Sequence, residues 1–136
     1  MNTELEMALR LLLATFLGAV IGFQRERMGK EAGMRTNMLI CLGSAIFTVL
    51  SIYGFPGSDP SRIAAGVATG IGFIGAGVIL HRNGGAVVGL TSAATIWVVA
   101  GIGVTAGAGM YIISGVATVL VLVILLLPHL NKPAGQ

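Results

Sequence analysis

Long apolar runs separated by short polar segments predict five membrane-spanning helices. The runs cover residues 5–23, 36–53, 62–80, 86–105 and 110–127. Each is close to the roughly 20 residues that a helix needs to cross the hydrocarbon core of a bilayer. The fourth run has two alternative starts, since Gly89 can leave the preceding residues irregular and delay the helix to Thr91. We therefore expect an all-α membrane protein with a single transmembrane domain over residues 1–136.

The composition agrees with a membrane location and argues against a soluble enzyme. Hydrophobic residues make up 55% of the chain and charged residues only 10%, whereas soluble domains carry about 25% charged residues. The segment Gly70–Gly75 has the spacing GxGxxG. That spacing indicates a dinucleotide site only between a strand and a helix, and here it lies inside an apolar run. We expect neither an enzyme nor a cofactor.

The basic residues predict the orientation of the chain. The formal net charge is +3, which in this setting indicates topology signals and not a nucleic-acid partner. With the N-terminus outside, the inner side receives Arg25, Arg27, Lys30, Arg35, Arg82 and Lys132. The outer side receives Arg62 and Arg10. This bias predicts an N-out, C-in topology.

Glycine is unusually frequent, with 21 residues that fall largely within the apolar runs. Small residues let helices approach closely in lipid, where no hydrophobic force drives them together. The positions that we expect to pack helices, or to kink the third one, are Gly18, Gly22, Gly66, Gly70, Gly72, Gly75 and Gly77. Five helices cannot cover so many small-residue faces, so we expect a homo-oligomer.

Polar chemistry is concentrated at the expected inner face. The candidate ion or ligand site there consists of Gln24, Arg25, Glu26, Arg35, Thr36, Asn37, Gly89, Thr91 and Thr95. The alternative is a charge cluster that fixes topology and contacts the headgroups of membrane lipids. Glu26, Glu31 and Asn37 offer the oxygen ligands that Mg²⁺ prefers, although the sequence contains no pattern that predicts a metal site.

Arg10 is a charged residue inside the first apolar run, and it has two interpretations. It lies four residues after Glu6, the spacing at which side chains on a helix are neighbours. The two can therefore form an ion pair near the outer interface. Alternatively, Arg10 extends alone to the headgroups.

Several segments, in this order, resemble the MgtC/SapB family of bacterial inner-membrane proteins. They are Arg25-Glu26, the stretch from Ala32 to Asn37, the stretch from Asp59 to Ala65, the glycine run from Gly70 to Ile79, and Gly89 to Trp97. The resemblance covers nearly the whole chain. It implies a multi-pass protein of the bacterial inner membrane that is linked to magnesium homeostasis. Longer members carry a cytoplasmic ACT-like domain, and we expect the transmembrane domain only.

The sequence departs from the family pattern at three positions, and this bears on function. Gln24 stands where the family usually has Glu, and Val88 where it usually has a basic residue. Gly66 stands where the family often has Gln. These departures weaken the case for ion transport. We expect action through lipids or other inner-membrane proteins, and the alternative is a transporter or channel for Mg²⁺ or another small ion.

Overall fold

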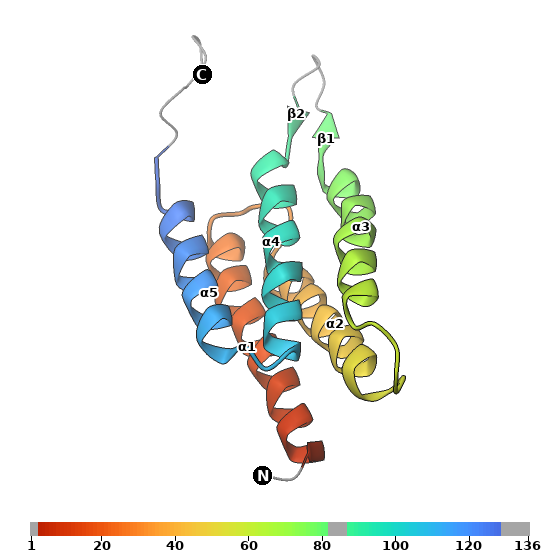
Figure 1. The fold of residues 1–136 in the computed structure, drawn as a ribbon. Coiled ribbons are helices and arrows are strands. Elements are labelled where there is room, and N and C mark those ends of the chain that lie inside the picture. The colour runs from red at the N-terminus through yellow and green to blue at the C-terminus, as the bar shows by residue number, and fades with distance from the viewer. Residues whose placement is uncertain (1–2, 82–86, 129–136) are drawn as a thin grey trace, which may run out of the picture.

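The computed structural model describes residues 3–81 and 87–128, and this part of the chain folds into five helices (Figure 1). They are α1 (Thr3–Arg27), α2 (Met34–Tyr53), α3 (Ser61–Val78), α4 (Leu90–Gly107) and α5 (Tyr111–Leu125). Two short strands, β1 (Leu80–His81) and β2 (Val87–Val88), pair antiparallel between α3 and α4. The expectation of an all-helical bundle is confirmed, with this small hairpin as an addition.

The helices differ in their ability to cross a bilayer. By length and apolar composition, α1, α2, α3 and α4 are candidate membrane spans. Helix α5 has only 15 residues and therefore rises about 22 Å, less than the hydrocarbon thickness of about 30 Å. Its helical part is thus shorter than the apolar run from which it was predicted.

Successive helices run in opposite directions, so the connections gather at two ends (Figure 1). The α1–α2 connection and the β-hairpin lie at the same end. We call this the basic end, because it carries Arg25, Arg27, Lys30 and Arg35. The orientation of the bundle in the membrane stays a prediction. Arg82 and Lys132, which were also counted as basic residues of the inner side, lie outside the described residues.

Helix α1 is longer than the apolar run 5–23 from which it was predicted. Helix α1 continues to Arg27, since Gln, Arg and Glu are good helix formers. It ends in a Schellman motif, in which Lys30 N–H bonds the Arg25 carbonyl and Gly29 N–H bonds the Glu26 carbonyl, both at 3.0 Å. Gly29 adopts the left-handed φ of +67° that this motif requires.

Helix α4 begins at Leu90, which agrees with the later of the two predicted starts and not with a start at Ala86. Gly89 precedes it with a φ of +91°. A side chain at this position would also overlap the carbonyl of Val78 at the end of α3. The sharp change of direction from strand to helix thus requires glycine.

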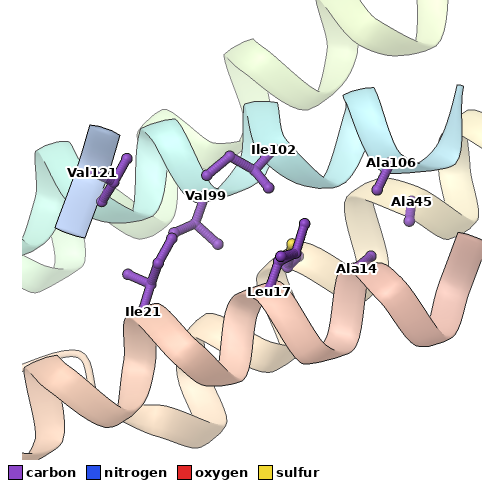
Figure 2. Packing of buried hydrophobic residues seen from close by; sticks show 9 residues of the cluster. Ala14, Leu17, Ile21, Ala45, Val99, Ile102, Ala106 and Val121 are labelled. Carbon is purple, nitrogen blue, oxygen red and sulfur yellow. The ribbon is translucent and has the colours of Figure 1, made fainter. Parts of the chain in front are cut away.

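The core lies where α1, α2 and α4 meet, with α5 on one side (Figure 2). Its buried members are Ala14, Leu17, Ile21, Cys41, Ala45, Val99, Ile102, Ala106 and Val121. Many of these side chains are small, so the helix backbones themselves come close together. A second, smaller cluster joins α3 to α4 and consists of Ala32, Ile71, Ile96 and Ala100.

Four glycines permit this close approach. A Cβ on Gly18 would lie 2.7 Å from the Asn37 carbonyl oxygen, and one on Gly22 would lie 2.6 Å from Met34 Cα. On α4, a Cβ on Gly103 would overlap the Cys41 carbonyl. A Cβ on Gly107 would likewise lie 2.8 Å from the Ala45 carbonyl. Helix α2 is therefore held between α1 and α4 by backbone-to-backbone contact.

Helix α3 stands at the edge of the bundle beside α4 (Figure 1). It buries only Ile71 and Gly75. A Cβ would meet nothing within 4 Å at Gly66, Gly70, Gly72 or Gly77. Within a single chain, these four glycines do not pack against another helix, in contrast to Gly18 and Gly22.

We predict that Gly103→Ala destabilises the protein and that Gly72→Ala does not. The added methyl group at position 103 would overlap backbone that cannot move away, at a cost of about 1–3 kcal/mol. At position 72 the space is open, and alanine favours the helix. Thermal unfolding in detergent measures both variants against the wild type. Equal melting temperatures would contradict the close packing of α2 against α4.

Candidate functional site at the basic end

Two arginines of α1 contact opposite ends of α4. Arg10 Nη1 donates a hydrogen bond of 3.0 Å to the carbonyl of Gly107, the last residue of α4. Arg25 Nη2 donates one of 2.8 Å to the hydroxyl of Ser92, in the first turn of the same helix. Both arginines are buried, at 7% and 4% exposure respectively. They define two polar clusters, one at each end of the bundle.

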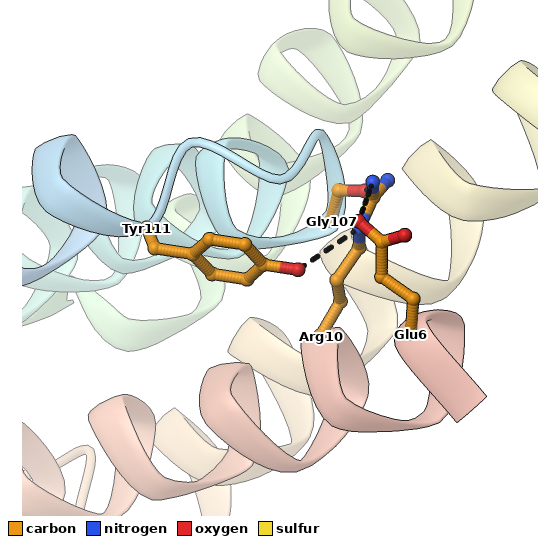
Figure 3. A network of polar contacts seen from close by, with 4 residues as sticks. All are labelled: Glu6, Arg10, Gly107 and Tyr111. Carbon is orange, nitrogen blue, oxygen red and sulfur yellow. Dashed lines mark hydrogen bonds and ion pairs between the residues drawn. The ribbon is translucent and has the colours of Figure 1, made fainter. Parts of the chain in front are cut away.

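The cluster around Arg10 is fully paired and has a structural role (Figure 3). Arg10 Nη2 forms a 2.8 Å ion pair with Glu6, and Nε lies 3.4 Å from the Tyr111 hydroxyl. The guanidinium also lies 5.5 Å from the ring centroid of Tyr53. Arg10 therefore does not extend alone to the headgroups, but joins α1 to α2, α4 and α5.

The cluster around Arg25 is arranged differently. Ser92 Oγ accepts a hydrogen bond from Arg25 and donates one of 2.8 Å to Glu31 Oε2. The structure shows no direct ion pair within 4.0 Å between Glu31 and Arg25. Glu31 thus reaches the buried guanidinium only through the hydroxyl of Ser92. Arg25 Nε is buried and has no hydrogen-bond partner.

Two further buried polar atoms near the basic end lack partners. Asn37 is 0% exposed, and its amide nitrogen donates to the carbonyls of Ala32 at 3.2 Å and Gly33 at 2.8 Å. Its Oδ1 is unpaired, as is Oε1 of Gln24. An unpaired buried polar atom is costly, and such atoms are few in native structures. This end of the bundle therefore has unused hydrogen-bonding capacity.

The structure brings only some of the predicted site residues together. Arg25 and Asn37 are buried, and Gln24 and Thr36 are half-buried. Glu26, Arg35 and Thr91 are exposed. Thr95 is buried, and its hydroxyl donates a hydrogen bond of 2.7 Å to the Thr91 carbonyl of its own helix. Gly89 shapes the entry to α4 and offers no side chain.

Ser92 and Glu31 were missing from the predicted site, although they complete the contact with Arg25. The sequence pointed to Thr91 and Thr95, which share one helical face. The face that meets α1 is instead that of Ser92, one position further along the helix. The signal that could have found it is the row Ser92, Ile96, Val99 and Gly103, which follows helical spacing and is buried throughout.

No group of three or more His, Cys, Asp and Glu side chains lies close enough to hold a metal ion in the part of the chain that the structure describes. Glu31 binds Ser92 and its own backbone. Glu26 lies beside Gly33, where a Cβ would be 3.0 Å from its Oε1. Glu31 is thus engaged with Ser92, whereas Glu26 and Asn37 both lie near Gly33.

Two apolar grooves flank α3. The first, of about 520 Å³, lies between α2 and α3 and includes Gly43, Phe47, Gly66 and Gly70 in its lining. The second, of about 410 Å³, lies between α3, α4 and α5 and is lined in part by Trp97. Trp97 is 61% exposed, so it does not pack into the bundle.

The four candidate spans, the glycine contacts and the apolar outer surface define a polytopic membrane protein. Sequence comparison makes this class more specific, because the model of the MgtC family matches residues 11–132. The chain belongs to the MgtC family, as the resemblance predicted.

Individual relatives support this assignment. The chain is 49% identical over 132 residues to "Putative magnesium transporter YhiD" of Escherichia coli K12, covering 91% of this chain and 61% of the relative. It is 47% identical over 114 residues to "Protein MgtC" of Salmonella typhimurium LT2, covering 84% of this chain and 48% of the relative. The chain therefore spans about half to three-fifths of the length of these relatives. A search of the solved structures gave no match.

We predict that Arg10→Leu destabilises the fold more than Glu6→Gln. Leucine leaves the Gly107 carbonyl and Tyr111 hydroxyl without the guanidinium, a loss of about 1–3 kcal/mol for a buried polar partner. Glutamine at position 6 removes only a charge whose side chain is 35% exposed. Thermal unfolding in detergent gives the order. A larger loss for Glu6→Gln would show that the ion pair, and not the contact with α4, dominates.

We also predict a contribution of Glu31 to the pH dependence of stability. Hydrogen bonds from its own backbone and from Ser92 hold the pKa of the Glu31 carboxyl below its ordinary value. A lowered pKa in the folded state stabilises the protein above the ordinary value, and this is lost as the pH falls through the lowered one. Glu31→Gln should therefore lose stability less steeply on acidification from about pH 7 to about pH 3.

The remaining acid sensitivity should include Asp59, whose pKa is lowered mainly by hydrogen bonds from Ser61. Asp59→Asn is thus a control that leaves the contribution of Glu31 in place. Identical pH profiles for wild type and Glu31→Gln would contradict the bond to Ser92.

Proposed function

We propose that this chain is the membrane-embedded part of a protein that supports magnesium or other ion homeostasis through contacts with membrane partners. The observation that carries the proposal is the incomplete packing of α3. This helix buries only two of its residues, Ile71 and Gly75, and leaves an apolar groove on each side. Membrane helices associate through such small-residue surfaces.

The partner that fits best is a second copy of this chain, so that a homo-oligomer forms through α3. The face of Gly66 and Gly70 is open in the single chain, and α1 and α4 show that glycines of the same sequence pack tightly where a neighbour is present. Lipids or another inner-membrane protein could occupy the same grooves. The family supports a location in the bacterial inner membrane. The basic residues at one end of the bundle support an orientation with the N-terminus outside.

A second candidate function is the transport of Mg²⁺ or another small ion. The printed name of the YhiD relative favours it. The distribution of acidic residues argues against it, because Glu4, Glu6, Glu26, Glu31 and Asp59 are the five in the chain. All lie in loops or near the ends of α1, so none offers a carboxylate to a cation in the middle of the bilayer.

We predict that Gly70→Leu weakens self-association or partner capture without unfolding the chain. A Cβ at this position would have no neighbour within 4 Å, and Gly70 lines the groove between α2 and α3, which a leucine would therefore occupy. Thr69→Leu is the matched control, because position 69 precedes it on the same exposed helix. Crosslinking in membranes and co-purification measure the association.

The same preparations, reconstituted in liposomes, test transport against empty liposomes. We expect no magnesium flux above that control. Saturable flux that is lost on changing Arg35, Asn37 or Thr91 would overturn the proposal in favour of transport. An unchanged assembly of Gly70→Leu would overturn the role of α3.

A further inference from the structure

The direction of α1 relative to α4 places its two buried arginines in opposite electrostatic surroundings. The helices run antiparallel (Figure 1), so Arg10 meets the C-terminus of α4 and Arg25 meets the N-terminus. A helix C-terminus carries a partial negative charge and a helix N-terminus a partial positive one. Arg10 is therefore stabilised by α4, whereas Arg25 adds a positive charge to an end that is already positive.

The first turn of α4 has no side-chain cap to offset this charge. Its N-cap is Gly89, which makes no side-chain hydrogen bond to the helix. The first N–H groups of any helix lack partners within it and point toward bound anions. Ser92, whose hydroxyl accepts the hydrogen bond from Arg25, lies in this first turn.

The carboxylate of Glu31 offers the Arg25 guanidinium only an indirect contact. Glu31 is exposed and contacts Arg25 through Ser92 Oγ. Arg25 is 4% exposed, and its Nε has no acceptor. A guanidinium has five N–H donors in a planar fork that suits phosphate and carboxylate groups. One donor is used by Ser92, so the site has capacity for a further anion.

We propose that Arg25 and Ser92, at the N-terminus of α4, bind a phosphate-type oxyanion, with Glu31 as a competing carboxylate of the protein itself. The guanidinium and hydroxyl donate to the oxyanion, which takes the place of the Glu31 carboxylate. Exposed Arg27, Lys30 and Arg35 at the same end attract anions toward the site. This site does not depend on the partner role of α3.

A phosphate group can come from free inorganic phosphate or from an anionic phospholipid headgroup. Two arms of one experiment separate these sources. In the first arm, inorganic phosphate is titrated into protein in an uncharged detergent, and binding is followed by calorimetry and by the melting temperature. In the second arm, the melting temperature is compared between nanodiscs of phosphatidylcholine and nanodiscs containing phosphatidylglycerol.

The variant Glu31→Gln provides the most specific test, because it removes the competing carboxylate without touching Arg25. We expect it to bind the phosphate group at least about tenfold more tightly than wild type. The reason is that the phosphate no longer has to displace the charge-assisted hydrogen bond between Ser92 and Glu31. Glu26→Gln is the matched control, since it removes the same charge from an exposed position at the same end. It should change the affinity by less than about fivefold.

Changes at Arg25 should have the opposite effect. Arg25→Gln should weaken binding at least about tenfold, and Arg25→Lys, which keeps the charge but not the fork, should also weaken it. If Arg25→Gln does not fold, Arg25→Lys and the contrast between Glu31→Gln and Glu26→Gln still decide the question.

Each outcome supports or overturns the site. Saturable phosphate binding in detergent with this order of variants supports it and identifies a free oxyanion. No binding in detergent, but stabilisation by phosphatidylglycerol with the same order, supports it and identifies a headgroup. If neither arm responds, or if Glu31→Gln and Glu26→Gln behave alike, Arg25, Ser92 and Glu31 are a structural bridge only.

Discussion

The close approach of α1, α2 and α4 is the constraint on which the rest of the structure depends. In hydrocarbon, an apolar side chain gains nothing by leaving lipid for protein, so contact between helices must come from fit and from polar bonds. Gly18, Gly22, Gly103 and Gly107 bring backbones within van der Waals distance. These contacts hold α1 and α4 against α2, and two arginines of α1 contact the ends of α4.

Much of the fold could be predicted from the sequence, because membrane helices are defined by length and apolar character. The number of helices, the later start of α4 and the turn role of Gly89 all follow from local pattern. The extension of α1 through Arg27 was missed because a charged segment in a membrane protein is usually taken as a connection. The helix continues there because its residues favour helix and Gly29 supplies the termination that follows.

The candidate site was harder to predict than the fold, because it depends on how two distant helices are rotated toward each other. Arg25 could be selected as a charged residue at a membrane face. That Ser92 and not Thr91 meets it depends on the packing of α4 against α1, which local sequence does not specify. In the same way, nothing in the sequence distinguishes the packed Gly18 and Gly22 from the open Gly66 and Gly70. All four follow the same four-residue spacing.

The hairpin between α3 and α4 has a mechanical consequence. Leu80 pairs with Val88 only two residues before α4 begins, and the Gly89 backbone lies against the Val78 carbonyl at the end of α3. The end of α3 is thus joined closely to the first turn of α4 by backbone contacts. We therefore expect a tilt of α3 within the bilayer to displace the first turn of α4 and, with it, the Ser92 hydroxyl that links Arg25 to Glu31.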